Sequence, residues 1–100
     1  MDVAVGIVGV APAYVALVAE AWIDAGVGHG IPPEVASQLV AEAIAGSSEL
    51  LLAHDVDTLA VRQAVTTPGG VTAQGLAALE RGGVRPAFRD ALDAVVRHLG

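Results

Sequence analysis

Apolar residues recur at the spacing of a helical face near the start of the chain. One such face is made by Tyr14, Leu17, Val18, Ala21, Trp22 and Ala25. Because Pro12 suits a first helical turn and Gly26 opens a glycine-rich break, the pattern predicts a helix over about 12–26. Its other sides are also apolar, which predicts burial on more than one side. In so short a chain the second side is expected to belong to another subunit, with Tyr14 and Trp22 as core or interface anchors.

A second helix is predicted to open at the Ile31–Pro33 segment and to run to about His54. A solvated stripe is formed by Glu34, Gln38, Glu42, Ala45 and Glu49. A broad stripe expected to be buried contains Val35, Leu39, Val40, Ala43, Ile44, Leu50 and Leu51. Small residues near the middle of this helix, among them Gly46 and Ser47, would let a partner backbone come close.

Three shorter helices complete the prediction. The first covers about 57–65, is capped by Asp55 or Asp57, and turns Leu59 and Val65 inward. The second of these helices follows the Thr66–Thr72 segment and ends at about Arg81. The third covers about 85–99. The inward positions of the last helix are Phe88, Leu92, Val95, Val96 and Leu99. With no convincing strand, residues 1–100 are expected to form one all-α, five-helix domain that pairs with a second copy by interleaving helices.

The N-terminal run from Val3 to Ala19 carries no charge. A membrane span needs about 20 such residues, and a signal peptide needs a positive start where this chain has Asp2. Glycines and a proline interrupt the run, so a buried segment is expected rather than a membrane helix. Nor does the run open a dinucleotide-binding loop, because it offers Gly-x-x-Gly without the second strand that such a fold requires.

Composition narrows the classes of function. A formal charge of −6 with eleven acidic residues and only five basic ones leaves no basic surface for nucleic acid. Cysteine is absent, and the three histidines (His29, His54 and His98) lie far apart in the sequence, so no metal site is expected. Without an export signal, the cytoplasm is the expected location.

Turn-forming residues, hydroxyls and a helix start coincide between Thr66 and Glu80. Pro68 and the two glycines after it force the chain to turn, and Thr72 is a plausible N-cap of the helix that follows. The backbone amides of Gly70 and Val71 and of the first helical turn are then expected to be free, which suits an anion. A tight loop between two helices, with no ligand, fits the same pattern and is favoured by shape alone.

This segment resembles the C-terminal domain of pyrroline-5-carboxylate reductases. The resemblance covers nearly all of the chain and rests on Thr66–Thr72, Gly75–Glu80, Gly82–Arg85, Pro12–Tyr14, Asp24–Val27, Gly30–Pro32, Glu34–Ala36 and Gly46. The family reduces a cyclic imino acid to proline with NAD(P)H, which binds an N-terminal dinucleotide-binding domain that is absent here. At Val8 and Val10 the family usually has serines near the cofactor, so no cofactor-binding residue is expected in this chain.

The resemblance also implies a substrate site. Thr72 would place its hydroxyl near the imine nitrogen as the catalytic group, while Thr67 and the amides of Gly70, Val71 and Thr72 would hold the substrate carboxylate. The expected partners are a second copy and a small imino or amino acid. Without a dinucleotide-binding domain the chain is expected to be inactive. A non-catalytic oligomerisation module, a natural remnant or a designed sequence, is the alternative, and a membrane-associated helical protein is a third.

Overall fold

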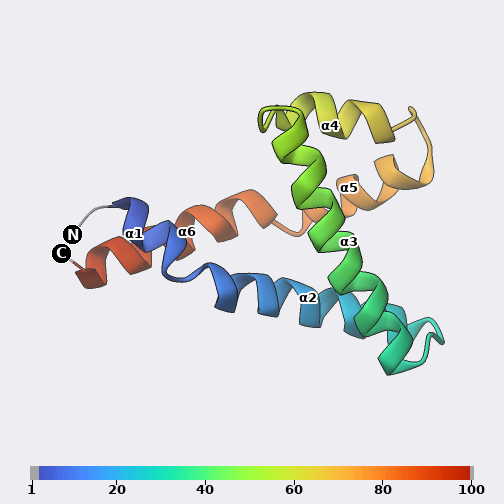
Figure 1. Cartoon of the computed structure of the whole chain (residues 1–100), viewed down its shortest axis with the longest axis horizontal. Coiled ribbons are helices and arrows are strands. Elements are labelled where there is room, and N and C mark those ends of the chain that lie inside the picture. Colours follow the sequence, from blue (N-terminus) through green and yellow to red (C-terminus); the bar gives the residue numbers. More distant parts are fainter. Residues whose placement is uncertain (1–2, 100) are drawn as a thin grey trace. The chain divides into compact units, whose positions relative to one another are not determined.

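The computed structural model describes residues 3–99, which are helical apart from the turns that join the helices (Figure 1). The helices are α1 (Val3–Val8), α2 (Ala11–Gly28), α3 (Pro33–Ala53), α4 (Thr58–Val65), α5 (Val71–Arg81) and α6 (Val84–Leu99). No strand occurs in the described range, so the predicted all-α class is confirmed. The five predicted helices are α2 to α6, while α1 was not predicted as a helix. Met1, Asp2 and Gly100, and the side chain of Leu99, lie outside the described part.

The chain divides into two compact units. One is formed by α2 and α3 (Val10–Thr58), and the other by α1 together with α4, α5 and α6, that is, the residues up to Gly9 and those from Leu59 onwards. The second unit thus joins two segments that are separated by half of the sequence.

In the first unit α2 and α3 pack against each other along the chain reversal at Gly30. Gly30 has a φ of +98°, which favours glycine. Its amide donates to the Val27 carbonyl at 2.9 Å and that of Ile31 to the Gly26 carbonyl at 3.2 Å, so α2 ends in a Schellman motif. The turn brings Ala36, which is 2% exposed, against α2, where a Cβ added to Gly26 would lie 3.7 Å from the Ala36 Cβ.

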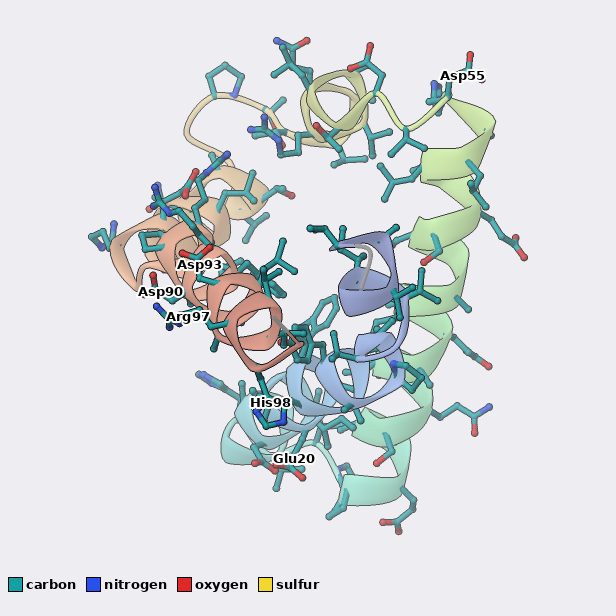
Figure 2. All side chains as sticks on the ribbon, turned by 90° about the vertical axis from the view of Figure 1, so that its left-hand side faces the viewer. Glu20, Asp55, Asp90, Asp93, Arg97 and His98 are labelled. Atoms are coloured by element: carbon teal, nitrogen blue, oxygen red, sulfur yellow. The ribbon has the colours of Figure 1, made fainter. Side chains whose placement is uncertain are left out.

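The end of α3 is closed by the same motif without a glycine. The Val56 amide donates to the Leu51 carbonyl at 2.8 Å, and the Asp55 amide to the Leu52 carbonyl at 3.2 Å. Asp55, which Figure 2 labels at the end of α3, has a φ of 54°, and the β-branched Val56 has a φ of 58°. A left-handed conformation is costly for a β-branched residue, so this closure stores backbone strain.

In the second unit α6 packs against both α1 and α5. The reversal between α5 and α6 uses Gly83, whose φ is +82°. An ion pair spans it, because the Arg85 Nε lies 2.9 Å from both carboxylate oxygens of Glu80. On α6 the side chains of Asp90, Asp93 and Arg97 project on one side (Figure 2).

Most of the residues predicted to face inward are exposed within the single chain. Among the described apolar side chains only Ala36 and Val40 are buried. The N-terminal segment, expected to be buried, exposes Val3, Val5, Ile7 and Val8. Positions predicted to face inward are likewise left exposed by the single chain at Val35, Leu39, Leu50, Leu59, Val65 and Phe88. Leu92, Val95 and Val96 are half-buried, in the predicted direction. The reason is geometric, since a helix that is apolar all round can cover only one side with one neighbour.

Two stretches, Val3–Gly28 and Pro33–Ala53, are long and apolar enough to cross a membrane by length and composition alone. Little of either is buried within the chain. Large exposed apolar surfaces of this kind are typical of sites that contact another molecule.

The strained end of α3 generates a stability prediction. Val56→Gly removes the left-handed strain and little packing, because Val56 is 56% exposed, so the free energy of unfolding should rise by about 1 kcal/mol. His54→Gly is the control. His54 has a φ of −104°, so glycine there relieves no strain and should lower stability by a similar amount. Thermal unfolding at one protein concentration measures both, and a Val56→Gly variant no more stable than wild type would contradict the strain.

Candidate functional site

A tight turn over Thr67–Gly70 forms the corner between α4 and α5. The Gly70 amide donates to the Thr67 carbonyl at 2.9 Å, and Gly69 has a φ of +73°. Proline in the second position and a glycine of positive φ in the third are the residues that a type II turn requires. The predicted turn is therefore confirmed, and it follows from Pro68 and Gly69 alone.

Helix α5 begins one residue before Thr72, so the prediction that Thr72 is the N-cap is wrong. The cap is Gly70, whose extended backbone (φ −80°, ψ 179°) leads out of the turn and which makes no side-chain cap bond. The first helical bond runs from the Gln74 amide to the Gly70 carbonyl at 3.1 Å. Thr72 thus lies within the first turn, and its hydroxyl makes no capping bond to any residue that the structure describes.

Three amides of the first turn precede that bond. Those of Val71, Thr72 and Ala73 have no backbone acceptor among residues 3–99. The amide of Gly70, which was expected to be free as well, is occupied by the turn. Three adjacent donors at the positive end of a helix dipole can bind a carboxylate or phosphate, so the corner retains the chemistry that was predicted for it.

The side chains around these amides are open to solvent. Thr67 and Thr72 are exposed, and Val71 is 90% exposed. A Cβ added to Gly70 would lie 2.7 Å from the Thr67 Oγ1 and 3.1 Å from the Thr67 carbonyl oxygen, which is too close. Glycine at position 70 therefore lets the Thr67 hydroxyl lie against the backbone that leads into α5. The fold brings together all four predicted site residues: Thr67, Gly70, Val71 and Thr72.

A further residue of the corner escaped sequence reasoning. The Oγ1 of Thr66 is buried and has no hydrogen-bond partner within the described part of the chain. Thr66 also lines a hollow of about 180 Å³ together with Arg62, Gln63, Pro68 and Leu76. Thr66 belongs to the Thr-Thr-Pro-Gly-Gly signature, but the burial of one hydroxyl leaves no mark in a sequence. No group of three metal-ligating side chains forms among residues 3–99.

Comparison with known proteins identifies the family. Residues 1–99 match the family model described as pyrroline-5-carboxylate reductase dimerisation. The chain belongs to this family. The resemblance noted from the Thr66–Arg85 signature is therefore confirmed, and self-association is the property that the family description assigns to this domain.

Individual proteins of known name support the same family assignment. The chain is 45% identical over 96 residues to pyrroline-5-carboxylate reductase of Thermus thermophilus and 39% identical over 97 residues to that of Synechocystis, covering 96% and 97% of this chain. The crystal structure of Plasmodium falciparum pyrroline carboxylate reductase with NADP bound matches 98% of the chain with a TM-score of 0.91 and 37% identity. The chain spans only 36–37% of the length of each of these three proteins.

Two glycine variants test the geometry of the corner. Gly70→Ala forces the Thr67 side chain to move and should destabilise the protein by about 1–3 kcal/mol. Gly75→Ala is the matched control, because Gly75 lies inside α5 with no atom within 4 Å of an added Cβ. Alanine there should stabilise the chain by up to about 1 kcal/mol. Thermal unfolding compares the two, and equal effects at both positions would show that the Thr67 contact is not formed.

Proposed function

We propose that this chain is the dimerisation and substrate-binding part of a pyrroline-5-carboxylate reductase. Joined to a dinucleotide-binding domain, such a protein reduces 1-pyrroline-5-carboxylate to proline. The observation that carries the proposal is the Thr67–Thr72 corner, where exposed hydroxyls and free amides occur together in a chain that matches the family over residues 1–99.

The groups of the corner have distinct roles in this proposal. The amides of Val71 and Thr72, with the Thr67 hydroxyl, hold the substrate carboxylate through charge-assisted hydrogen bonds. Gly70 contributes by lacking a side chain, since its own amide is taken by the turn. The Thr72 hydroxyl, free of any capping role, donates a hydrogen bond to the imine nitrogen, whose basicity and charge change as it becomes an amine.

The cofactor NAD(P)H supplies the hydride from the other domain. The segment that leads to α2 has valines at positions 8 and 10, and Val8 is 72% exposed. Valine has no polar group, so these two side chains cannot form hydrogen bonds with a nucleotide. Reduction of the substrate is therefore proposed to require a separate domain that binds the cofactor. The solved relative that contains NADP is almost three times as long as the matched region, which leaves room for a separate cofactor domain.

A second copy is the proposed cover for the exposed apolar helices, by interleaving. On α2, Leu17 is 65% exposed and Trp22 is 52% exposed, and such side chains are typical anchors of a homodimer interface. Transfer into lipid would cost free energy for each of the carboxylates of Glu20 and Asp24 on α2 and Glu42 on α3. We therefore propose that the protein is not membrane-bound but soluble, and that it is located in the cytoplasm. The alternative is a pure oligomerisation module, that is, a dimer that binds no ligand at the corner. The titration with proline described below distinguishes the two.

Turnover in a reconstituted mixture tests the substrate role. The chain is mixed with a separate dinucleotide-binding domain, pyrroline-5-carboxylate and NADPH, and oxidation of NADPH is followed. Thr72→Val, which removes the donor to the imine nitrogen, should lower kcat about 10²-fold, whereas Thr72→Ser, which keeps the hydroxyl, should lower it far less.

Titration of the chain alone with proline gives a readout that needs no partner domain. Backbone NMR signals of Gly70 and Thr72 should shift on addition of proline, because the carboxylate binds next to them. A stable dimer whose corner signals do not move would favour the oligomerisation module and count against substrate binding.

Association is tested separately by sedimentation equilibrium. Leu17→Glu places a charge on the exposed apolar side of α2 and should weaken the dimer at least 100-fold while leaving the helical content unchanged. Ala45→Glu is the control, since it adds the same charge to the exposed acidic stripe of α3 without removing a side-chain hydrogen bond. A monomeric wild type at high concentration would overturn the dimer.

A further inference from the structure

The buried hydroxyl of Thr66 has no role in the site described above. Its Oγ1 is inaccessible to solvent and has no partner among residues 3–99, although the residue as a whole is only half-buried. A buried hydroxyl without a hydrogen bond lowers stability by the loss of its hydration, so such atoms are rare in folded proteins. A hydrogen-bonding group that reached this hydroxyl would remove that cost.

The hollow beside Thr66 indicates the chemistry of that group. Pro68 and Leu76 form apolar walls, and Arg62 and Gln63 supply polar ends. Arg62 forms no ion pair within the described part, because the nearby carboxylate of Glu80, which shares a second hollow with it, is bound to Arg85. With a guanidinium and a hydroxyl as donors, the group that enters should be an acceptor oxygen.

Thr66 can reach such a group without movement of the backbone. The residue lines the hollow, and rotation about χ1 from one staggered position to another redirects its hydroxyl while the backbone stays in place. The backbone itself is held by the adjacent turn, in which the Thr67 carbonyl accepts from the Gly70 amide. A hydrogen bond to Thr66 would thus fix the residue from which the turn starts.

A second copy of this chain is the occupant that the surroundings favour. The helices that bound the hollow expose apolar side chains, namely Leu59 and Val65 on α4 and Val71 and Leu79 on α5. Residues 1–99 match a dimerisation family, and the eleven acidic residues of each copy supply acceptor oxygens that complement Arg62. A surface both apolar and cationic fits such a partner better than it fits lipid or nucleic acid.

We infer that an acceptor oxygen of a second copy enters the hollow between α4 and α5 and is bound by Thr66 and Arg62. Thr66 is then a positioning residue that links dimer formation to the geometry of the Thr67–Thr72 corner. This inference rests on the proposed function, since it requires both the dimer and a substrate bound at the corner.

Sedimentation equilibrium on the full chain measures the contact. Thr66→Val is isosteric but lacks the hydroxyl, and it should raise the dimer Kd about tenfold, while Thr66→Ser should stay within about threefold of wild type. Arg62→Gln should raise the Kd about threefold and reduce its dependence on salt. Arg89→Gln, the same charge change on α6 away from the hollow, is the control and should leave the Kd unchanged.

Titration with proline, followed by NMR at Gly70 and Thr72, tests the link to the corner. Thr66→Val should bind proline more weakly at concentrations where it is a monomer. At concentrations where the variant is again fully dimeric through its remaining contacts, binding should return to within about threefold of wild type. Weak binding by the dimeric variant would mean that the hydroxyl contacts the ligand directly, and would overturn the positioning role.

Several results would overturn the inference while the proposed function stands. Wild-type association of a folded Thr66→Val variant would show that no group of the second copy bonds to the hydroxyl. If circular dichroism shows that Thr66→Val does not fold, then Arg62→Gln decides, and an unchanged Kd rejects the contact. Failure of the proposed function looks different, because wild type itself would then be a monomer or would give no shift with proline.

Discussion

The fold is governed by an excess of apolar helix surface over the number of helices available to cover it. Residues of the apolar class make up 54% of the chain, yet Ala36 and Val40 are the only apolar side chains buried among those described. Within one unit α2 and α3 cover a single side of each other, and the remaining sides are left with exposed leucine, valine and tryptophan. Burial of such surface is the main favourable term in folding and association, so the exposed helix sides favour the self-association that the family description assigns to this domain.

The helix ends depend on local backbone chemistry rather than on that burial. Glycines of positive φ end α2 and separate α5 from α6, while Asp55 and Val56 end α3 at a cost in backbone strain. Because each closure is made by hydrogen bonds between neighbours in the sequence, the positions of these helix ends follow from local contacts. What remains for association to decide is how the exposed faces are paired.

The Thr67–Thr72 corner before α5 depends partly on local hydrogen bonds and partly on groups that local contacts do not provide. Its turn is local, closed by a 2.9 Å bond between the Gly70 amide and the Thr67 carbonyl, and it releases three helix amides for an anion. The residue that precedes the turn is not satisfied locally, because Thr66 buries a hydroxyl with no partner within residues 3–99. The turn is therefore fixed by contacts between neighbours in the sequence, whereas the surroundings of the Thr66 hydroxyl are not completed by such contacts.

The amino-acid sequence by itself determined the helical class, the ends of α2 to α6 within a few residues, the turn at Pro68 and Gly69, and the family. These features follow from periodicity and from φ preferences that act between near neighbours, and the signature around Thr66–Thr72 is likewise contiguous. The tertiary structure alone decided that Gly70 rather than Thr72 caps α5, that the Gly70 amide is occupied, and that the hydroxyl of Thr66 is buried. It also showed that stripes such as Val35 and Leu39 are exposed, because periodicity reports that a face is apolar but not whether the same chain supplies a neighbour to cover it.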